Sequence, residues 1–587
     1  MLRYLSLITA LLATPLAAQE PLFRVSPRQT HPKDKTEIEF NALFSMPAPT
    51  GYLPVRVTVV NQRKSDGEFS VDTISKSGSG GDDSEISSEF SLSSVAGTTS
   101  TYDLMVPLTT VLNHGSYGSG SSTSVTMNGS FGRESGSLQS NYADDASAVM
   151  MSEKLHTPNA STLDAELNKR SSSYSSPTFA GKFNPLEMPE DWRAYSGYDA
   201  FLMTDDDWNQ VGAGARNAIF QWCRLGGELL IYRLNSSTTY SSLGIDSDQG
   251  NFGYGIIRLL SIETSLALDA PKLVDRFRKK TFLPTQSESI RDDFSASWPL
   301  HESFGRQKFA YGIFIVVLIA FGLLVGPINL FVFAKSGMRH RLFITTPIIS
   351  VATSALLILL ILLKDGTGGR GERVALIEVR PDSGENNAYV LQEQISRTGV
   401  LLGGSFDLEE SAAITPVPIS ESAWARLTPH NGGGGMRYTA KFNDGKLGVT
   451  GDWFQSRSEQ GQLIRAVIPT RGRIEIKAGG GPPVLLSTFE YPLESVYYTD
   501  RTKGYWIAKD LKPGTNTTCT PITKAEYTAA IRDQASKLGN RHRQILQTAS
   551  RRSDHYVAIA TEAPAVDSFD SINWVNTHTI LTGPTLR

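Results

Sequence analysis

The sequence predicts a multidomain membrane protein in which β-rich and α/β domains flank a two-helix transmembrane hairpin. Two apolar runs without a charged residue lie close together in the 587-residue chain, at 309–333 and 342–363. A helix of roughly 20 residues crosses a hydrocarbon core of about 30 Å, so each run is long enough to span a bilayer. Short β-pattern runs on both sides of the hairpin and one strand–helix–strand segment predict the remaining domains.

The first 18 residues are typical of a secretory signal peptide. Arg3 precedes an apolar stretch from Leu5 to Leu12, and small residues stand at Ala17 and Ala18. We expect cleavage near Ala18, and the alternative is an uncleaved N-terminal anchor. In both cases the chain from residue 20 onward is exported.

The loop between the apolar runs, 334–341, predicts the orientation of the hairpin. It carries Lys335, Arg339 and Arg341. Short loops rich in Lys and Arg stay on the cytoplasmic side of a membrane. Both flanks, 19–308 and 364–587, are therefore expected on the opposite side.

Charge and cysteine content exclude some classes of protein. A net charge of −3 gives no strong field that would indicate nucleic acid as a partner. Cys223 and Cys519 are the two cysteines of the chain, fewer than a disulfide-stapled exported protein normally carries. A bridge between them would join the two flanks, but the sequence around Cys223 favours a buried core residue.

Residues 19–144 are predicted to form a β-sandwich domain. Runs such as TEIEFNALF (36–44) and TYDLMVPL (101–108) are rich in Val, Thr, Phe and Tyr and are separated by turn residues. The Ser- and Gly-rich stretches 76–89 and 114–124 indicate long hairpin loops or connectors.

Residues 145–262 are predicted to form an α/β domain. Buried strands are expected at 146–152, 198–204 and 228–232, with one helix over 206–225 between the last two. Apolar residues recur there at helical spacing, so one face is buried; they are Trp208, Val211, Ala215, Ile219 and Trp222. Asp205 or Asp206 is expected to cap the start of the helix, and Gly226 and Gly227 to end it.

The remaining segments carry less information. Residues 263–308 are expected to form a helical linker that leads into the membrane, because 266–280 has an amphipathic helical pattern. Residues 364–587 alternate between short β-type runs and turns, apart from a helical pattern at 524–547. We therefore predict an exported β-rich domain with one late helix.

Three segments together resemble a known group of proteins. The phrase YDAFLMTDDDWNQVGAGARNAIFQWCRLGGELLIY (198–232) resembles the glutamine-amidotransferase-like α/β modules of large bacterial membrane proteins. Gly326, Pro327 and Asn329, followed by a basic turn, resemble the hairpin of that group, and 492–515 resembles its β-sandwich repeats. The resemblance implies a flavodoxin- or amidotransferase-like fold that has lost its activity. It also implies a location in the bacterial cytoplasmic (inner) membrane, with both large domains on the periplasmic or extracellular side.

The candidate catalytic residues have simpler structural explanations. Catalytic amidotransferases present their cysteine on a tight turn between strand and helix, whereas Cys223 lies late in a predicted helix. Asp205, Asp206 and Asp207 follow a predicted strand, where carboxylates could hold Mg²⁺ or Ca²⁺. Helix capping is the favoured interpretation of these three carboxylates.

Other motifs are weaker still. The loop 244–255 begins like a calcium loop at Asp246 and Asp248, but the residue expected to be Glu is Ile257, so its glycines more simply form turns. The four glycines 432–435 lack a following Lys-Ser/Thr, and the histidines show no zinc spacing. The basic clusters 541–543 and 551–552 could contact anionic lipid or a partner, but a solvated face is favoured. We therefore predict no catalytic, cofactor-binding or metal-binding residue and no cofactor.

Small residues inside the membrane predict close helix contacts. Gly322 and Gly326 form a GxxxG pattern on the first helix, and Thr346, Ser350 and Ser354 form a stripe on the second. These faces are expected to pack within the hairpin, and self-association through Gly322 and Gly326 is the alternative.

Two functions remain open from the sequence. One is a non-catalytic envelope membrane protein, a scaffold or a module that binds proteins or glycans. The alternative is an envelope hydrolase that uses the α/β domain, with an acid pair such as Asp205 and Asp207. The expected partners are the lipid bilayer and envelope proteins or glycans, and not nucleic acid.

Overall fold

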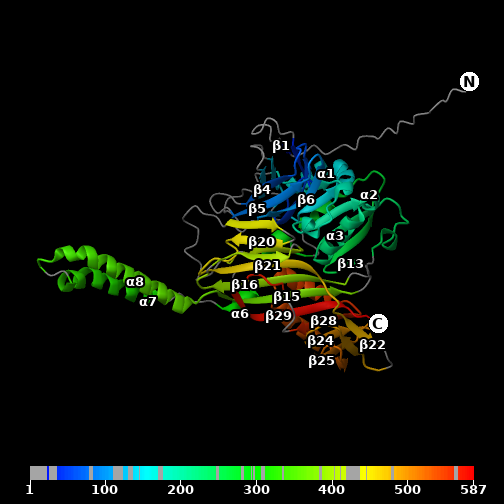
Figure 1. Cartoon of the computed structure of the whole chain (residues 1–587). Coiled ribbons are helices and arrows are strands. Elements are labelled where there is room, and N and C mark those ends of the chain that lie inside the picture. Colours follow the sequence, from blue (N-terminus) through cyan, green and yellow to red (C-terminus); the bar gives the residue numbers. More distant parts are fainter. Residues whose placement is uncertain are drawn as a thin grey trace, which may run out of the picture.

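Figure 1 shows a body of stacked sheets from which two long antiparallel helices project. The computed structural model describes residues 23–25, 36–77, 84–109, 123–129, 136–143, 146–169, 176–245, 250–278, 283–292, 294, 298–305, 311–333, 336–381, 386–401, 403–409, 411–417, 419, 437–443, 446–477, 481–560 and 566–586. The predicted signal peptide and Lys335 lie outside these residues.

The N-terminal region folds into two sheets that share a hydrophobic core. Alternating burial along Glu37–Ala42 and Gly51–Val60 turns one face of each strand toward that core. Phe40 and Val57 from one sheet and Phe69 and Leu92 from the other belong to the same buried cluster. The first sheet contains β1 (Phe23–Val25), β2 (Glu37–Ala42), β3 (Gly51–Val60) and β6 (Thr99–Leu108), and the second contains β4 (Gly67–Ser77), β5 (Ser84–Ser94), β7 (Thr123–Gly129) and β8 (Gly136–Gln139).

The second of these sheets continues into the C-terminal half of the chain. β5 pairs in parallel with β19 (Arg437–Asn443), which continues through β20 (Lys446–Gly451) to β17 (Phe406–Glu409). The rings of Phe90 and Phe442 stack across this pair, 4.7 Å between centroids. The segments 19–144 and 364–587, which are predicted as separate domains, therefore share one sheet. If both projecting helices cross a bilayer, this pairing requires the two flanks to lie on the same side of it.

The α/β region is a sheet of five parallel strands with one short antiparallel edge strand. The spatial order is β10-β9-β11-β12-β14-β13, the strand order of doubly wound folds of the flavodoxin type. The strands are buried on both faces, as parallel strands between helices are. Their bounds are β9 (Val149–Ser152), β10 (Ala180–Phe183), β11 (Ala200–Thr204), β12 (Glu228–Arg233), β13 (Asn251–Phe252) and β14 (Gly255–Ser261).

Helices cover both faces of this sheet. α1 (Glu153–Lys169) and α4 (Ala270–Arg278) bury Leu163 and Phe277 in one core, together with Met151 of β9. On the other face, Ile219 and Trp222 pack in the large core that also contains the N-terminal sheets. α4 therefore belongs to the α/β layer and not to the helical linker that the sequence predicts at 263–308.

The helix predicted over 206–225 is two helices. α2 (Asp205–Gln210) ends at Val211, and α3 (Ala213–Arg224) begins after Gly212. The predicted N-cap is also wrong, because Thr204, and not Asp205 or Asp206, accepts the capping hydrogen bond. The predicted burial of Trp208, Val211, Ile219 and Trp222 is confirmed. The parallel pairing of β11 with β12 is confirmed as well.

The C-terminal half forms a nine-stranded sheet in the order β18-β21-β16-β15-β29-β28-β24-β25-β27 and a three-stranded sheet, β22-β23-β26. The larger sheet contains β15 (Gly369–Arg380), β16 (Asn387–Thr398), β18 (Ala412–Val417), β21 (Glu459–Pro469), β24 (Leu493–Thr499), β25 (Tyr505–Leu511), β27 (Thr520–Ile522), β28 (His555–Ala560) and β29 (Ile572–Pro584). The smaller sheet contains β22 (Ile474–Lys477), β23 (Val484–Ser487) and β26 (Asn516–Thr518).

The single late helix predicted at 524–547 is also two helices. α9 (Lys524–Ala535) stops at Ser536, and α10 (Asn540–Ala549) starts after Gly539. The backbone N–H of Gly539 donates to the buried carboxylate of Glu393, 3.0 Å away, so a tertiary contact fixes the chain at the break.

The basic cluster 541–543 is not a solvated face. Arg541 donates to the carbonyls of Pro284 and Gly226, and His542 Nδ1 lies 2.6 Å from Glu393 Oε1. Arg543 donates to the Leu538 carbonyl at 3.1 Å. Arg541 and His542 thus hold α10 against the α/β region and the large sheet.

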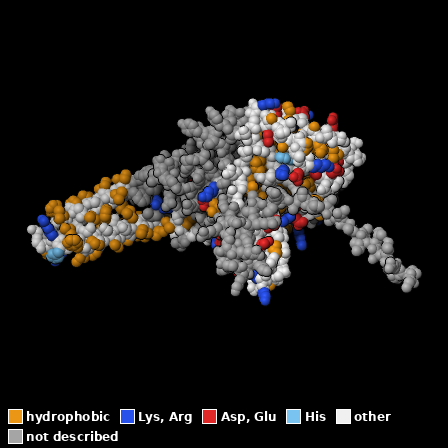
Figure 2. All heavy atoms as spheres, turned by 90° about the horizontal axis from the view of Figure 1, so that it is seen from above, with side chains coloured by type: hydrophobic (Ala, Val, Ile, Leu, Met, Phe, Trp, Pro, Cys, Tyr) orange, Lys and Arg blue, Asp and Glu red, His pale blue; other side chains and the backbone are white. Residues whose placement is uncertain are grey.

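Among the residues that the structure describes, two helices are long and apolar enough to cross a membrane. The first comprises α7 (Tyr311–Leu323) and a π-helical stretch, η5 (Leu324–Phe333), which contains Pro327; the second is α8 (Leu342–Asp365). Figure 2 shows hydrophobic side chains over the whole projecting pair and basic ones at its tip. Arg339, His340 and Arg341 form the short helix η6 at that tip.

A polar contact joins the two long apolar helices. Asn329 is fully buried, donates to Thr346 Oγ1 at 2.9 Å and accepts from Thr345 Oγ1 at 2.6 Å. A Cβ built on Gly322 or Gly326 would meet no atom within 4 Å, so these two glycines are not packed within the hairpin as expected. Self-association through Gly322 and Gly326 stays a prediction.

Candidate functional site

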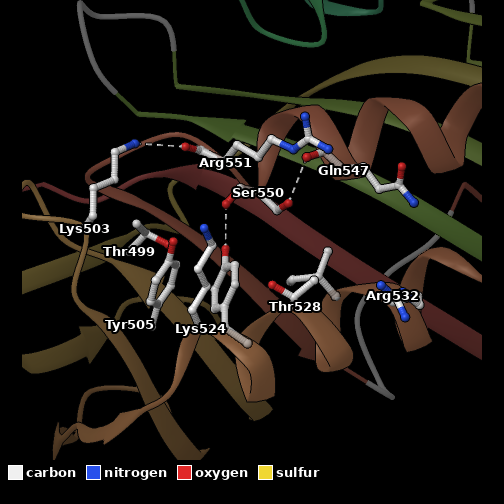
Figure 3. Close-up of a pocket in the computed structure, with 11 residues that line it drawn as sticks. Thr499, Lys503, Tyr505, Lys524, Thr528, Arg532, Gln547, Ser550 and Arg551 are labelled. Atoms are coloured by element: carbon white, nitrogen blue, oxygen red, sulfur yellow. Dashed lines mark hydrogen bonds between the residues drawn. The ribbon is translucent and has the colours of Figure 1, made fainter.

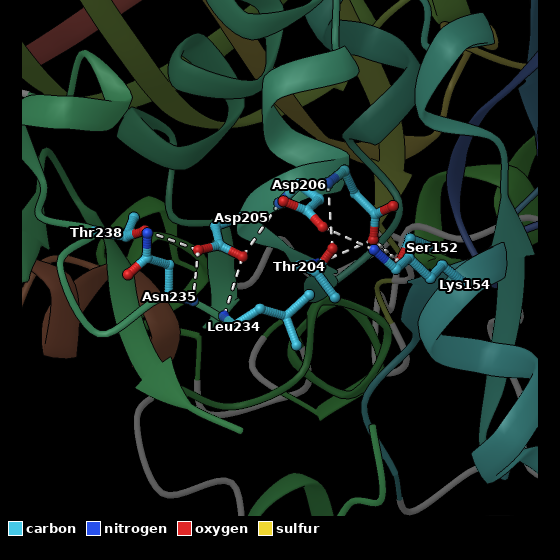
Figure 4. Close-up of polar contacts among 9 residues, drawn as sticks. Ser152, Lys154, Thr204, Asp205, Asp206, Leu234, Asn235 and Thr238 are labelled. Atoms are coloured by element: carbon cyan, nitrogen blue, oxygen red, sulfur yellow. Dashed lines mark hydrogen bonds and ion pairs between the residues drawn. The ribbon is translucent and has the colours of Figure 1, made fainter. Parts of the chain in front are cut away.

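The carboxyl edge of the parallel sheet is the candidate site. From β9 the chain passes to β10 on one side, while β11 lies on the other side of β9. This reversal is the topological switch point, beside which open α/β sheets bind their ligands. Figure 4 shows the residues that gather there from the ends of β9, β11 and β12.

Asp207 is a structural residue of this edge. Its backbone N–H donates to Thr204 Oγ1 at 3.1 Å, and Thr204 N donates back to Asp207 Oδ2 at 3.0 Å, which completes a capping box. Ser152 Oγ, at the end of β9, donates to the same Oδ2 at 2.6 Å. The carboxylate thus ties β9 to the start of α2.

Asp205 fastens the loop that follows β12. Its carboxylate accepts from Leu234 N at 3.1 Å, Asn235 N at 3.4 Å and Thr238 Oγ1 at 2.8 Å. Burial alone would raise the pKa of this carboxyl, but the hydrogen bonds to its charged form outweigh burial and lower the pKa below the usual value. Asp205 is therefore ionised at neutral pH and already bonded within the domain.

The exposed charges of the edge are paired with one another. Asp206 and Lys154 form an ion pair at 2.9 Å, and Glu153 and Lys182 form another at 3.2 Å. The capping interpretation is thus confirmed for Asp207, while Asp205 binds a loop and Asp206 a lysine. Over the described ranges, no group of three His, Cys, Asp or Glu side chains could hold a metal ion.

Cys223 lies late in α3 and is fully buried, as the sequence predicts. Burial raises the pKa of its thiol well above the ordinary value, with the Arg224 guanidinium as a weaker opposing influence. A neutral thiol inside a core is a poor nucleophile. Cys519 is also buried and free, so the two cysteines are not bridged in this structure.

The remaining predicted motifs divide into two groups. Asp246, Asp248 and the glycines 432–435 lie outside the described residues. The turn interpretation holds for Gly250 and Gly253, whose φ angles are +86° and +60°.

Sequence reasoning missed the buried contact on Glu393. This residue is 0% exposed, and its carboxylate accepts from Trp298 Nε1 at 2.8 Å and from Gly539 N at 3.0 Å, beside His542. The partners come from two segments, each far from Glu393 in the sequence, so no local pattern could indicate them. The local sequence offers no signal either, because Glu393 lies between Gln392 and Gln394 in β16.

Comparisons with known proteins add little to this description. No family model matches the chain, and a search of curated proteins found no match. Among solved structures, a cycloisomaltooligosaccharide glucanotransferase of Paenibacillus sp. is 10% identical, with a TM-score of 0.16, over 35% of this chain and 29% of that chain. A calcium-binding mutant of β-glucuronidase 2 from Bacteroides uniformis is 8% identical, with a TM-score of 0.14, over 35% and 24%.

A β-glucosidase from Kluyveromyces marxianus is 9% identical, with a TM-score of 0.09, over 81% of this chain and 44% of that chain. The matches thus span less than half the length of each of these three proteins. At these TM-scores the likeness indicates neither the fold nor the activity of this chain.

Proposed function

We propose that this protein is a non-catalytic, membrane-anchored protein of the bacterial envelope whose exported body binds envelope proteins or glycans. The observation that carries the proposal is the state of the carboxyl edge. Asp205 and Asp207, the acid pair that a hydrolase would need there, are each bonded to backbone and hydroxyl groups of their own domain. A general acid or base must reach a substrate atom, and these carboxylates are directed at the protein itself.

The anchoring supports the same role. Both flanks of the hairpin contribute strands to a common sheet and side chains to a common core, so the body is held to the membrane at one end. Arg339 and Arg341 lie at the opposite end of the hairpin. The positive-inside tendency supports a body that lies outside the cytoplasm.

The topology can be tested with reporter fusions to the full chain. A reporter that is active only in the periplasm should work after Gly366 and after the C-terminus, and should fail at Gly337 in the loop. Changing Lys335, Arg339 and Arg341 to Glu should disturb this pattern, because the loop would lose its orienting charge. An active fusion at Gly337 in the unchanged chain would show that the orientation is reversed.

The interaction role can be tested by photo-crosslinking in native membranes. Val95 and Leu186 are apolar side chains on the body that are 59% and 55% exposed, and each can carry a photoreactive group. We expect adducts with an envelope protein or glycan at these sites. The same group at Phe343, 85% exposed on the hairpin, should label lipid. Labelling of lipid alone at all three sites would contradict the proposal.

A second measurement separates this role from catalysis. The purified protein should show no turnover on a panel of esters, amides and phosphoesters, and the Cys223→Ser variant should behave identically. Cys223→Ser should lower stability by about 1 kcal/mol, because a hydroxyl replaces a buried thiol. Turnover that is lost in Cys223→Ser would support an amidotransferase-type enzyme, and turnover that is lost in Asp205→Asn would support the hydrolase alternative.

A further inference from the structure

Two adjoining pockets at one end of the large sheet form a groove lined by basic side chains. The first has a volume of about 800 Å³ and lies between the β24–β25 turn and the helices α9 and α10. The second has a volume of about 890 Å³ and lies between the same turn and the end of β15. Lys503 and Arg551 line both pockets. We call the two together the cationic groove; its Lys and Arg residues are Arg380, Arg501, Lys503, Lys524, Arg532, Arg551 and Arg552.

Part of this positive charge is balanced inside the protein. Arg380 and Arg552 each lie 3.7 Å from the buried carboxylate of Glu378. Arg501 forms an ion pair with Asp554.

The other four cations have no such partner. Within the described part of the chain, no carboxylate lies within ion-pair distance of the exposed side chains of Lys503, Lys524, Arg532 and Arg551. Figure 3 shows that these side chains come from the β24–β25 turn, from α9 and from the end of α10, and that they surround one hollow. Four positive charges thus face one space without internal compensation.

Both lysines occupy positions that the local backbone does not favour. Lys503 has φ +66°, a left-handed conformation in which Gly or Asn is strongly preferred. Lys524 is the first residue of α9, where the helix dipole favours negative charge. Arg551, by contrast, follows the end of α10, where a positive charge is favourable. The helix dipole therefore accounts for Arg551, whereas Lys503, whose Nζ donates to the Arg551 carbonyl at 3.3 Å, and Lys524 stand against the preference of the local backbone.

The groove lies at the membrane-distal end of the body. β15 leaves the hairpin at Gly369 and reaches the groove at Arg380. Its 12 residues extend about 36 Å at roughly 3.3 Å per residue. In Figure 1 the strands of this sheet continue away from the projecting helices. The headgroups of the anchoring bilayer are thus remote from the groove, and a soluble ligand can reach it.

We propose that the cationic groove binds a small soluble ligand with two or more phosphate groups. Each phosphate monoester carries a charge of about −1.5 to −2 at neutral pH, so two such groups balance the four uncompensated cations. Pocket volumes of about 800 and 890 Å³ are typical of small-molecule sites and exceed what a flat protein contact needs. The hydroxyl of Thr528, on α9 beside Lys524, lines the same hollow as a neutral donor.

The test uses the full chain in nanodiscs, with tripolyphosphate as the probe and calorimetry as the readout. The informative variant is Lys503→Asn with Lys524→Gln. It removes two charges and relieves both local conflicts, so it should fold at least as stably as the wild type. We expect it to bind tripolyphosphate about 100-fold more weakly, at roughly tenfold for each lost charge-assisted contact. The matched control is Lys509→Gln with Lys512→Gln, two exposed lysines outside the groove, which should bind like the wild type.

Further binding measurements identify the class of ligand. Orthophosphate should bind at least tenfold more weakly than tripolyphosphate, and nanodiscs with or without anionic lipid should give the same affinity. Equal weakening in both lysine pairs, or unchanged binding in the groove variant, would overturn the proposal. Binding of poly-glutamate without binding of tripolyphosphate would overturn it as well, in favour of an acidic peptide. Weaker binding of tripolyphosphate in anionic nanodiscs would show that lipid headgroups compete for the groove. That result would overturn the proposal that the ligand is soluble.

Discussion

Replacing Trp222 by alanine is expected to destabilise the body by roughly 3–5 kcal/mol, the usual cost of removing a large buried aromatic side chain. Trp222 is 1% exposed, and its ring meets those of Phe201 and Tyr195, with centroids 5.2 and 6.2 Å away. Its Nε1 has no hydrogen-bond partner among the described residues, so the loss is one of packing. The same core contains residues of the N-terminal sheets and of the large sheet, so the cavity weakens their contact too.

The structure also selects the control for this experiment. Arg216 is half-buried and donates to the carbonyls of Val211 and Asn209, both at 3.0 Å, so it is not a plain surface residue. Asn217 is exposed on the same helix, and Asn217→Ala should change stability by less than about 0.5 kcal/mol.

Thermal unfolding of the whole chain in detergent compares the two variants. A fragment of residues 19–300 would not serve, because it would leave the β5 edge without β19. Equal, small effects of Trp222→Ala and Asn217→Ala would show that α3 does not pack against the sheet as described.

Replacing Glu393 by alanine should have an effect of similar size. Removing one member of a buried charged network usually costs about 3–5 kcal/mol, because the remaining polar groups stay buried without partners. The groups that would lose their hydrogen-bond partner are Trp298 Nε1, the N–H of Gly539 and the ring of His542. Trp298 precedes α6 (Pro299–Phe304), the last helix described before the hairpin, so this carboxylate joins the membrane-proximal segment to α10 and the large sheet.

Three further variants make this result specific. Glu302→Ala, at an exposed site on α6, should change stability by less than about 0.5 kcal/mol. Trp298→Phe removes one donor and keeps most of the ring, so its effect should be smaller than that of Glu393→Ala. Glu393→Gln keeps the shape of the side chain but turns an amide N–H₂ group toward other donors. Its loss of stability should therefore lie between those of Trp298→Phe and Glu393→Ala.

The apparent Tm of the full chain reports on these variants. If Glu393→Ala melts at the same temperature as the wild type, the network does not hold α6 to the body.

Local sequence patterns determined the elements that depend on nearby residues. The two apolar runs needed no tertiary information, because the length and polarity of a segment decide whether it can cross a bilayer. The strand–helix–strand pattern at 198–232 was sufficient for the parallel pair β11–β12. The spacing of Trp208, Val211, Ile219 and Trp222 correctly assigned a buried face even though the helix is broken at Gly212.

The carboxyl edge was foreseeable in part. Three aspartates after a strand indicated helix capping, and Asp207 does complete a capping box. The role of Asp205 depends on a loop about 30 residues further along, and no spacing rule connects the two. Basic clusters were equally ambiguous, since Arg541 donates to carbonyls inside the protein while Arg551 lines a pocket.

The sequence by itself thus determined the two long apolar helices, the parallel pair β11–β12 and the buried face of the α/β helices. The tertiary structure alone decided that strands from both flanks share a sheet, that Glu393 joins three distant segments and that four cations gather in one groove. The physical reason is the range of the forces involved. Hydrophobic periodicity depends on neighbouring residues and can be read from a short segment. Strand pairing across hundreds of residues depends instead on which sheet edges and charges the folded chain brings together.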